Sequence, residues 1–483
     1  MRGGVAMGLS LFNSLTGQKE EFFPLHDKKV GFYVCGPTVY DFIHLGNARV
    51  FVVFDALRRF MEYLGYEVIF IQNFTDIDDK IIQRAQEMGK DPSWVAEHYI
   101  EQYQIDAGKL GIKEATYHPR ATQHISDIIQ LIETLEKKGF TYLVEGDVLF
   151  DVSRFPDYGK LSGKDPNQLL AGARVEIRYQ KRNPADFVLW KKAKPGEPSW
   201  ESPWGRGRPG WHIECSVMAM KYLGPTLDIH AGGIDLIFPH HENELAQSEA
   251  ASGKEFVRYW LHNGYINIQN QKMSKSLGNV VNVRELTETY PPRAIRLALL
   301  FAHYRRPMNI DQELLESAAK YLERIKNLVR NLYFIQKKLD QGLSRKQETG
   351  LEVAQELARM KDNFWFSLAD DFNTPQALAV LSDFIRFANQ YLHPSRGKWS
   401  WQRLEEIKLF LKEVDQVLGI VPQEEIISED REVIELVYQR EQARREKKWE
   451  QADIFREKIR SLGYVVEDTP LGSRWYRAEN EEN

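Results

Sequence analysis

The first hundred residues alternate between strand-like and helix-like hydrophobic patterns. Compact apolar runs cover residues 30–34 and 67–70. Between them, residues 46–66 place apolar side chains three and four positions apart, which is the spacing of a helix with one buried face. A strand, a helix and a second strand in this order predict a βαβ unit with a parallel sheet. The apolar helical positions are Val50, Val53, Phe54, Leu57, Phe60, Met61 and Leu64.

The alternation stops between residues 117 and 205. This stretch holds a strand candidate at residues 146–152 and a segment rich in proline and glycine at residues 195–210. Such turn-forming residues separate short elements. Strand patterns return at residues 226–230 and 265–268, so we predict an insertion between two halves of one sheet.

After about residue 315 the pattern is helical. Apolar residues recur at helical spacing over residues 314–332, and a second helical set runs from residue 354 to about residue 418. Residues 429–461 then predict a highly charged helix, with Trp449 among the residues of its apolar face. The remaining segments are a polar linker at residues 341–352, a strand candidate at residues 463–466 and, after it, residues 472–476.

Length and composition are those of an ordinary globular protein. The 483 residues, 43% hydrophobic and 28% charged, are enough for about three domains. No apolar run approaches the roughly 18 residues that span a bilayer, so we expect a cytoplasmic protein with no membrane partner. The net charge of −5 argues against indiscriminate binding to polyanions, but 64 Lys and Arg residues leave room for a local basic face.

Two short strings indicate nucleotide chemistry. His44–Asn47 reads His-Leu-Gly-Asn soon after the first strand, and Lys272–Ser276 reads Lys-Met-Ser-Lys-Ser. A nucleoside triphosphate site needs compact backbone close to the phosphates and mobile cations that neutralise charge as pyrophosphate leaves. Each string alone is a weak signal, and the pair is a strong one. Together they resemble the signatures of class I aminoacyl-tRNA synthetases.

A second set of residues has metal-ligand chemistry. Pro239 suits the first turn of a helix, which would place His240 and Glu244 on one face, four positions apart. An imidazole and a carboxylate make half of a tetrahedral zinc site, and Cys35 and Cys215 could supply thiolates. Alternatively, the histidines are satisfied polar residues and the cysteines are small buried apolar residues. A structural disulfide is not expected in a cytosolic chain of this size.

Longer motifs extend the resemblance to one family. They are Tyr33–Asp41, Asn73–Lys80, Gly210–Ser216, His230–Asp235, Phe238–Glu244, Lys272–Ser276, Asp371–Pro375 and Glu467–Pro470. With these motifs the chain resembles the cysteinyl-tRNA synthetases over nearly its whole length. The resemblance implies an α/β fold with a Rossmann-like parallel-sheet catalytic domain, an inserted acceptor-end subdomain, a helical bundle and a small C-terminal anticodon-binding domain.

The resemblance also implies domain boundaries along the chain. The expected segments are the two catalytic halves at residues 1–116 and 206–276, the insertion at 117–205, a stem-contact region at 277–315, the bundle at 316–424 and the anticodon-binding domain at 425–483.

A two-step reaction follows from the resemblance. Cysteine would attack the α-phosphate of ATP to give cysteinyl-adenylate, and the cysteinyl group would then pass to the 3′-terminal adenosine of tRNA(Cys). One zinc ion per subunit, held by Cys35, Cys215, His240 and Glu244, would distinguish cysteine from serine, because Zn²⁺ prefers thiolate to hydroxyl. We expect Mg²⁺ to accompany ATP, and the partners to be ATP, L-cysteine and tRNA(Cys) for a monomeric enzyme.

The same resemblance assigns roles to the two strings. His44, Gly46 and Asn47 would contact ATP at a helix N-terminus. Lys272 and Lys275 would close over the phosphates. Class I enzymes usually carry histidine where this chain has Asn47, and asparagine can donate a hydrogen bond but cannot carry charge. The catalytic set would be His44, Asn47, Lys272 and Lys275.

The amino-acid pocket has four candidates by resemblance, namely Gly36, Thr38, Thr75 and Trp211. Two of them have other interpretations, since Trp211 could be part of the core and Thr75 could cap a helix. His230 could support a strand end or join a cluster with the neighbouring histidines.

Two rival functions fit parts of the sequence. A ligase on the same scaffold could transfer cysteine to an amino sugar in thiol biosynthesis, but residues from about 350 to 483 favour a tRNA substrate. A non-catalytic RNA-binding or regulatory paralogue would be expected to lose some site residues, whereas Lys272–Ser276 and the four zinc-ligand positions are intact. The charged C-terminal helix is either a solvated face or part of an anticodon-binding module, with Trp475 as a stacking candidate. Met1 and Met7 are both candidate start residues.

Overall fold

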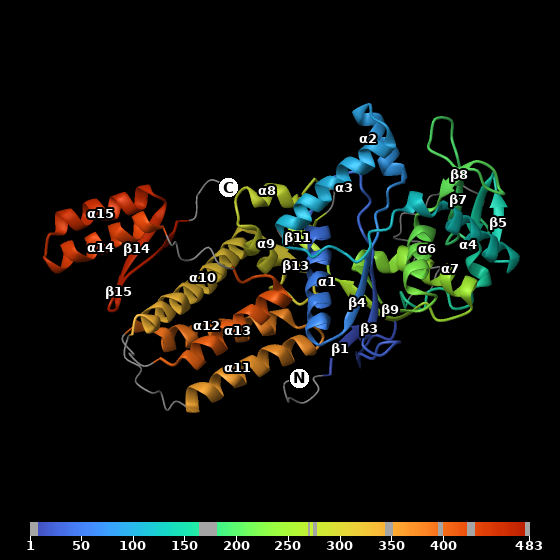
Figure 1. Cartoon of the computed structure of the whole chain (residues 1–483). Helices are drawn as coiled ribbons and strands as arrows, with labels where there is room; N and C mark the ends of the chain where they lie inside the picture. Colours follow the sequence, from blue (N-terminus) through green and yellow to red (C-terminus); the bar gives the residue numbers. More distant parts are fainter. Residues whose placement is uncertain are drawn as a thin grey trace. The chain divides into compact units, whose positions relative to one another are not determined.

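The chain divides into two compact units in the computed structural model (Figure 1). The first unit comprises Met1–Leu286, Ala302–Asp311 and Ala369–Asn373, and the second comprises Thr287–Phe301, Gln312–Leu368 and Thr374–Asn483. The domain boundaries given above stay predictions. The structure describes residues 8–163, 181–268, 271–273, 278–342, 351–394, 399–422 and 430–478.

A four-stranded parallel sheet forms the centre of the first unit. Its strand order is β10-β9-β3-β4. Helix α1 (Leu45–Tyr63) joins β3 (Lys29–Val34) to β4 (Glu67–Gln72), as the βαβ pattern predicts. β9 (Leu227–Gly233) pairs in parallel with β3 and with β10 (Val257–Asn263). The Rossmann-like fold class is therefore confirmed.

One strand of this sheet is missing from the sequence prediction. Strand β10 carries arginine, histidine and asparagine among its apolar residues, so its pattern is weak although it is almost wholly buried. The strand predicted at residues 265–268 is real, but it lies outside the central sheet. As β11 (Ile266–Ile268) it lies between β12 (Gln271–Lys272) and β13 (Met308–Ile310) in a separate small sheet.

Helices cover both faces of the central sheet. Helix α1 contacts β4 and β9 from one side, and α6 (Trp211–Leu223) contacts β3, β4 and β9 from the other (Figure 1). α7 (Glu242–Ser252) packs against α6. This layered arrangement leaves the carboxyl ends of the strands as the edge where ligands bind in such folds.

The predicted insertion contains an antiparallel sheet of its own. The strand order is β5-β6-β7-β8, and the candidate at residues 146–152 corresponds to β6 (Asp147–Phe150). Antiparallel pairing explains why the strand and helix alternation stops here. The other members are β5 (Thr141–Val144), β7 (Phe187–Lys192) and β8 (Gly207–Pro209), with α4 (Ile125–Lys137) packed beside β5.

The first unit is completed by a hairpin and a pair of helices. The hairpin consists of β1 (Ser10–Asn13) and β2 (Gln18–Glu21), and the helices are α2 (Asp79–Met88) and α3 (Pro92–Lys109). A short helix, α8 (Val283–Thr287), lies between β12 and β13 in sequence.

The second unit is helical, as its sequence pattern predicts. Five of its helices bury apolar faces. They are α9 (Pro292–Leu299), α10 (Gln312–Asp340), α11 (Leu351–Ala369), α12 (Thr374–Leu392) and α13 (Trp401–Leu418). None of the helices in the described ranges is long and apolar enough to cross a membrane.

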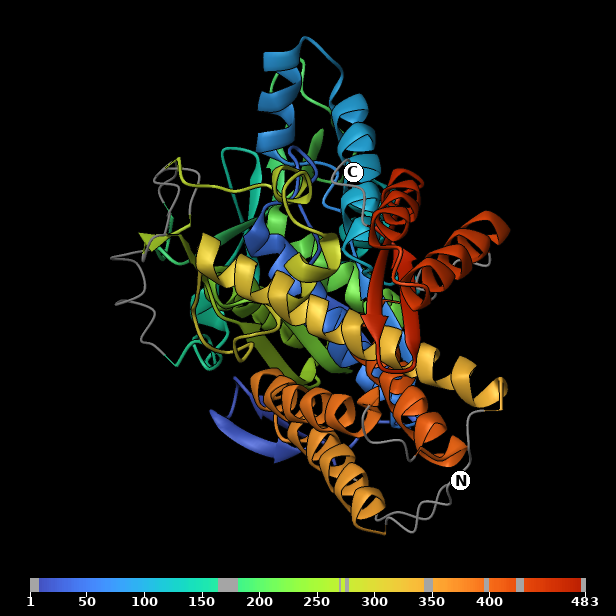
Figure 2. The same ribbon diagram turned by 90° about the vertical axis from the view of Figure 1, so that its left-hand side faces the viewer.

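The charged segment at residues 429–461 forms two helices instead of one. α14 (Arg431–Arg445) and α15 (Trp449–Ser461) lie side by side (Figure 2). The chain reverses at Lys447, whose φ of 60° is left-handed and ends the first helix. Trp449 is 56% exposed, which corrects its assignment to the apolar face.

A two-stranded hairpin ends the second unit. β14 (Tyr464–Thr469) and β15 (Gly472–Arg477) pair antiparallel, and β14 lies close to the strand predicted at residues 463–466. Trp475 packs against the small core of this hairpin and the helices beside it.

Candidate active site and metal centre

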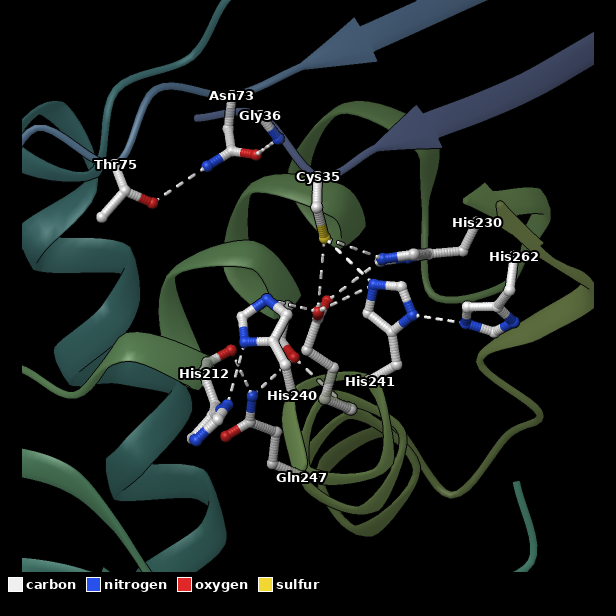
Figure 3. A network of polar contacts seen from close by, with 12 residues as sticks. Cys35, Gly36, Asn73, Thr75, His212, His230, His240, His241, Gln247 and His262 are labelled. Carbon is white, nitrogen blue, oxygen red and sulfur yellow. Dashed lines mark hydrogen bonds and ion pairs between the residues drawn. The ribbon is translucent and has the colours of Figure 1, made fainter. Parts of the chain in front are cut away.

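Four potential metal ligands from three distant segments meet in the first unit (Figure 3). Cys35 follows the end of β3, Cys215 lies on α6, His240 precedes α7, and Glu244 lies in the first turn of α7. Their ligand atoms all lie within 4.8 Å of one another, and all four residues are buried. The Nε2 atom of His240 is 2.9 Å from a carboxylate oxygen of Glu244. The residues chosen from the sequence therefore share one place.

The start of α7 differs from the prediction. The helix begins at Glu242 and not at Pro239, because Phe238 has extended backbone angles and Ile237–His241 forms a wider turn. His240 and Glu244 still face each other, since this turn continues directly into the helix.

A second set of donors adjoins the first. Cys35, His230, His241 and Glu244 also bring four ligand atoms within 4.8 Å of one another. The Sγ atom of Cys35 is 3.2 Å from Nε2 of His241 and 3.5 Å from Nε2 of His230. Cys35 and Glu244 belong to both sets. His230 thus joins the histidine cluster, which was one of its two interpretations.

The ring orientations of two histidines are fixed by outer hydrogen bonds (Figure 3). Nδ1 of His240 lies 2.9 Å from Nδ1 of His212. Nδ1 of His241 lies 2.8 Å from Nε2 of His262, whose own Nδ1 is 2.8 Å from the Ser14 hydroxyl. In metal sites such contacts hold the other ring nitrogen toward the ion.

The electrostatics of the cluster favour a bound cation. Burial raises the pKa of the Cys35 thiol and of the Glu244 carboxyl, so their anions are unstable without a counter-charge. The hydrogen bond between the two thiols lowers the pKa of Cys215 to about 7. Glu244 Oε2 is buried with no hydrogen-bond partner among the described residues. Two sulfurs, one imidazole and one carboxylate fit a divalent metal ion.

Three of the pocket candidates lie in the loops that follow β3 and β4. Thr38 and Thr75 form a bridge between two loops, and the backbone N–H of Gly36 donates to the Asn73 side chain at 2.9 Å. A Cβ at Gly36 would lie 1.7 Å from the Asn73 carbonyl oxygen, so only glycine fits. Thr75 does not cap a helix, because Asp78 caps α2.

Trp211 borders a cavity beside the metal ligands. It is 40% exposed and its ring stacks on His240 with centroids 4.2 Å apart, so it is not part of the core. The cavity has a volume of about 280 Å³ and is lined by charged groups, including Asp79, Lys191 and Arg208. Asp79 forms ion pairs with both Lys191 and Arg208, and apolar side chains also line the cavity.

The two signature strings meet at the start of α1. His44 caps this helix: the Asn47 backbone N–H donates to its Nδ1 at 3.2 Å, and the Asn47 side chain accepts from the His44 N–H at 3.5 Å. This reciprocal capping box gives Asn47 a role that needs no charge. A Cβ at Gly46 would lie 3.1 Å from the Met273 side chain, so the strand bearing Lys272 passes close to the helix start. Lys275 lies outside the described residues.

Comparison with known proteins first defines the class. Residues 21–320 match the model of the tRNA synthetases class I (C) catalytic domain. The fold resembles that of Mycobacterium tuberculosis methionyl-tRNA synthetase in complex with methionyl-adenylate, with a TM-score of 0.62 at 18% identity over 81% of this chain and 92% of that one. Agrobacterium radiobacter LeuRS, in a ternary complex with tRNA and LeuAMS, gives a TM-score of 0.59 at 12% identity over 83% and 85%. The protein is a class I aminoacyl-tRNA synthetase.

Further matches define the family. Residues 363–422 match the DALR domain, and residues 430–475 match the cysteinyl-tRNA ligase anticodon binding domain. The cysteine–tRNA ligase of Caldicellulosiruptor saccharolyticus is 52% identical over 96% of this chain and 99% of its own length. The cysteine–tRNA ligase of Clostridioides difficile is 48% identical over 97% of this chain and 100% of its own length. The chain belongs to the cysteine–tRNA ligase family, and the resemblance seen in the sequence is confirmed.

Proposed function

We propose that this chain activates L-cysteine with ATP and transfers the cysteinyl group to the 3′-terminal adenosine of tRNA(Cys). The observation that carries the proposal is the cluster of Cys35, Cys215, His240 and Glu244 in the same unit as the His44 cap of α1. A thiol-binding metal ion explains why two buried thiols and a buried carboxylate lie within 4.8 Å of one another. The fold supplies ATP chemistry, and the cluster supplies the choice of amino acid.

Zinc is the metal that best fits this donor set. Cys35, Cys215, His240 and Glu244 would hold one ion per subunit, and the ion would supply affinity for a thiolate over a hydroxyl. Shape alone separates near-isosteres such as serine and cysteine by only about 10–200-fold. Protein synthesis needs roughly 10⁴–10⁵, which corresponds to about 5.5–7 kcal/mol.

The remaining residues bind and orient the substrates. Since Nδ1 of His44 accepts a hydrogen bond within the capping box, its Nε2 carries the proton and would donate it to an ATP phosphate. Asn47 fixes the ring, Gly46 lets the nucleotide approach the backbone, and Lys272 adds positive charge as pyrophosphate leaves. Mg²⁺ would accompany ATP, and Lys275 would join Lys272 on the same string.

The amino acid would lie between the metal ligands and the cavity beside Trp211. Gly36 and Thr38 follow β3, Thr75 follows β4, and these three residues would bind its backbone groups. The amino-sugar alternative gains no support from the chain, because residues 430–475 match an anticodon-binding model. We propose a monomeric, cytoplasmic enzyme.

Cysteine-dependent exchange between ATP and pyrophosphate tests this proposal. Purified chain should catalyse exchange with L-cysteine and discriminate against L-serine by at least about 10⁴. It should charge tRNA(Cys) and contain one equivalent of zinc by elemental analysis. Absence of cysteine-dependent exchange would reject the enzyme assignment, and charging of an amino sugar without charging of tRNA would support the alternative.

A further inference from the structure

Arg49 is a fully buried cation on the helix that His44 caps. It lies in the second turn of α1, with no exposed surface. Among the described residues, no carboxylate lies within ion-pair distance of its guanidinium group. Burial lowers its pKa to about 10, so the group is still a cation at neutral pH. A buried charge of this kind is costly unless hydrogen bonds offset the loss of water.

The guanidinium group binds four backbone carbonyls from two segments. Its Nη1 donates to the carbonyls of Gly264 at 2.9 Å and Tyr265 at 3.1 Å. Its Nη2 donates to the carbonyls of His303 at 3.2 Å and Arg306 at 2.8 Å. The planar fork of arginine can reach four acceptors at once, whereas a lysine ammonium is a single point with three donors.

Both segments lead directly into the small sheet that carries Lys272. Gly264 and Tyr265 precede β11, and His303 and Arg306 precede β13. β11 pairs with β13 on one side and with β12, the strand of Lys272, on the other. Arg49 therefore connects the residues just before β11 and β13 to α1, the helix that His44 caps.

Two further close contacts restrict movement of the residues just before β11 and β13. A Cβ at Gly264 would lie 2.5 Å from the backbone carbonyl of Arg306, so the two segments touch directly. The Nζ atom of Lys272 lies 3.6 Å from the centre of the Tyr265 ring, a cation–π contact. A shift of Tyr265 would thus move the aromatic ring on which Lys272 rests.

We propose that Arg49 is a positioning residue for adenylate formation, which holds the strand of Lys272 in register with the ATP-binding start of α1. The inference rests on the proposed function. Arg49 does not touch substrate, and it acts by setting the distance between the two signature strings. Positioning of this kind matters because a displacement of about 1 Å can cost about 100-fold in rate.

The test compares Arg49→Lys with Arg58→Lys on the same helix. Arg58 is also buried, donates to the Glu114 carbonyl at 2.7 Å and pairs with Glu62 on its own helix, and among the described residues it makes no hydrogen bond to the small sheet. Both variants lose a buried arginine, so both should lower the unfolding midpoint. Rates are normalised to active sites by titrating the adenylate formed per chain. A misfolded fraction then cannot imitate a lower kcat.

Arg49→Lys should lower kcat for pyrophosphate exchange at least about ten-fold, with KM for cysteine and the zinc content unchanged. Arg58→Lys should stay within about two-fold of wild type. Hydrogen exchange at the amides of Ile266–Ile268 and Lys272 should be faster in Arg49→Lys alone. Wild-type kcat in Arg49→Lys, an equal loss in Arg58→Lys, or unaltered amide exchange would each overturn the inference. Failure of the proposed function would instead abolish exchange in the wild-type chain, and the amide measurement would still report on Arg49.

Discussion

At the residue scale, two sets of donors could each hold the proposed metal ion. Both contain Cys35 and Glu244, and they differ in whether Cys215 and His240 or the neighbouring His230 and His241 complete the tetrad. The sets are close to each other because His240 and His241 are consecutive and both rings turn toward Glu244. The set with two sulfurs suits zinc better, since thiolates are the softer ligands.

Single substitutions separate the two sets. Cys215→Ser should weaken zinc binding by more than the roughly 10–100-fold that outer-partner changes cause, because it removes a direct ligand. His241→Gln should retain one equivalent of zinc. Chelator competition monitored by elemental analysis measures both. The reverse pattern, with zinc lost from His241→Gln and kept in Cys215→Ser, would move the metal to the second set.

His118 should make the fold less stable in acid. Its ring stacks on Phe74, its Nδ1 donates to the Gln72 carbonyl at 2.8 Å, and the Ala115 N–H donates to its Nε2. Burial lowers the pKa of His118, so the unfolded chain binds a proton at a higher pH than the folded chain does. The stability contribution is complete above about pH 6.5 and is lost as the pH falls toward the folded-state pKa.

The substitution His118→Gln removes this titration. Its free energy of unfolding should change less between about pH 7.5 and about pH 5.5 than that of wild type. The difference should be at most about 1.4 kcal/mol for each unit by which the folded-state pKa of His118 lies below the unfolded-state pKa. Thermal unfolding followed by circular dichroism at several pH values measures the difference. Parallel curves for the two proteins would contradict the assignment.

At the element scale, we expect the capping box at the start of α1 to link the stability of this helix to nucleotide binding. Asn47→Ala removes the acceptor for the His44 N–H and should cost about 0.5–1 kcal/mol. It should also raise KM for ATP in pyrophosphate exchange, with KM for cysteine unchanged, because the His44 ring would lose part of its support. Asn47→Gln, with a residue usual at this box position, is the control and should recover most of both effects. Equal behaviour of the two variants would refute this role.

The turn between α11 and α12 is held by one buried carboxylate. Asp371 is almost fully buried and has a left-handed φ of 57°. Its side chain accepts hydrogen bonds from the Phe12 N–H at 2.9 Å, the Tyr304 hydroxyl at 2.8 Å and the Arg305 guanidinium at 2.7 Å. Asp371 and these three partners all belong to the first unit.

Asp371→Asn tests this anchor without changing its shape. Asparagine tolerates the left-handed backbone but cannot pair with Arg305, so the variant should lose about 2–3 kcal/mol of stability. Asp370→Asn is the matched control. It breaks only an exposed pair with Lys19 and should cost less than about 1 kcal/mol. Denaturant unfolding compares the two, and equal losses would show that the buried network is unimportant.

At the scale of the whole molecule, adenylate formation and tRNA reading use different parts of the chain. The metal cluster and both signature strings lie in the first unit, whereas residues 430–475 match the anticodon-binding model. The C-terminal hairpin packs within the second unit, where the Lys337 ammonium lies over the Trp475 ring.

Truncation after residue 422 should therefore separate the two steps. The shortened chain should keep cysteine-dependent exchange within about two-fold and lose at least about 100-fold in kcat/KM for charging tRNA(Cys), a difference of about 2.7 kcal/mol. Zinc content serves as the folding control for the first unit. Unchanged charging would rule out an anticodon role for this segment.

The sequence by itself determined the elements whose pattern is local. The βαβ unit, the helical second unit and the two signature strings follow from periodicity and short motifs, because these depend on residues close together in the chain. The donor types were also visible, since two cysteines, a histidine and a glutamate stand out by chemistry alone. The break at Lys447 was missed because no proline or glycine marks it.

Only the tertiary structure decided which of these residues meet. Strand β3, which Cys35 follows, pairs with β9, which carries His230. Helix α6, α7 and the turn before α7 add the other donors. The competing donor set therefore could not be predicted from spacing along the chain. The same holds for Arg49, which looks like an ordinary polar residue of a helix until its four carbonyl partners are in place. Distances between segments far apart in sequence depend on packing of the whole core, and local patterns do not contain them.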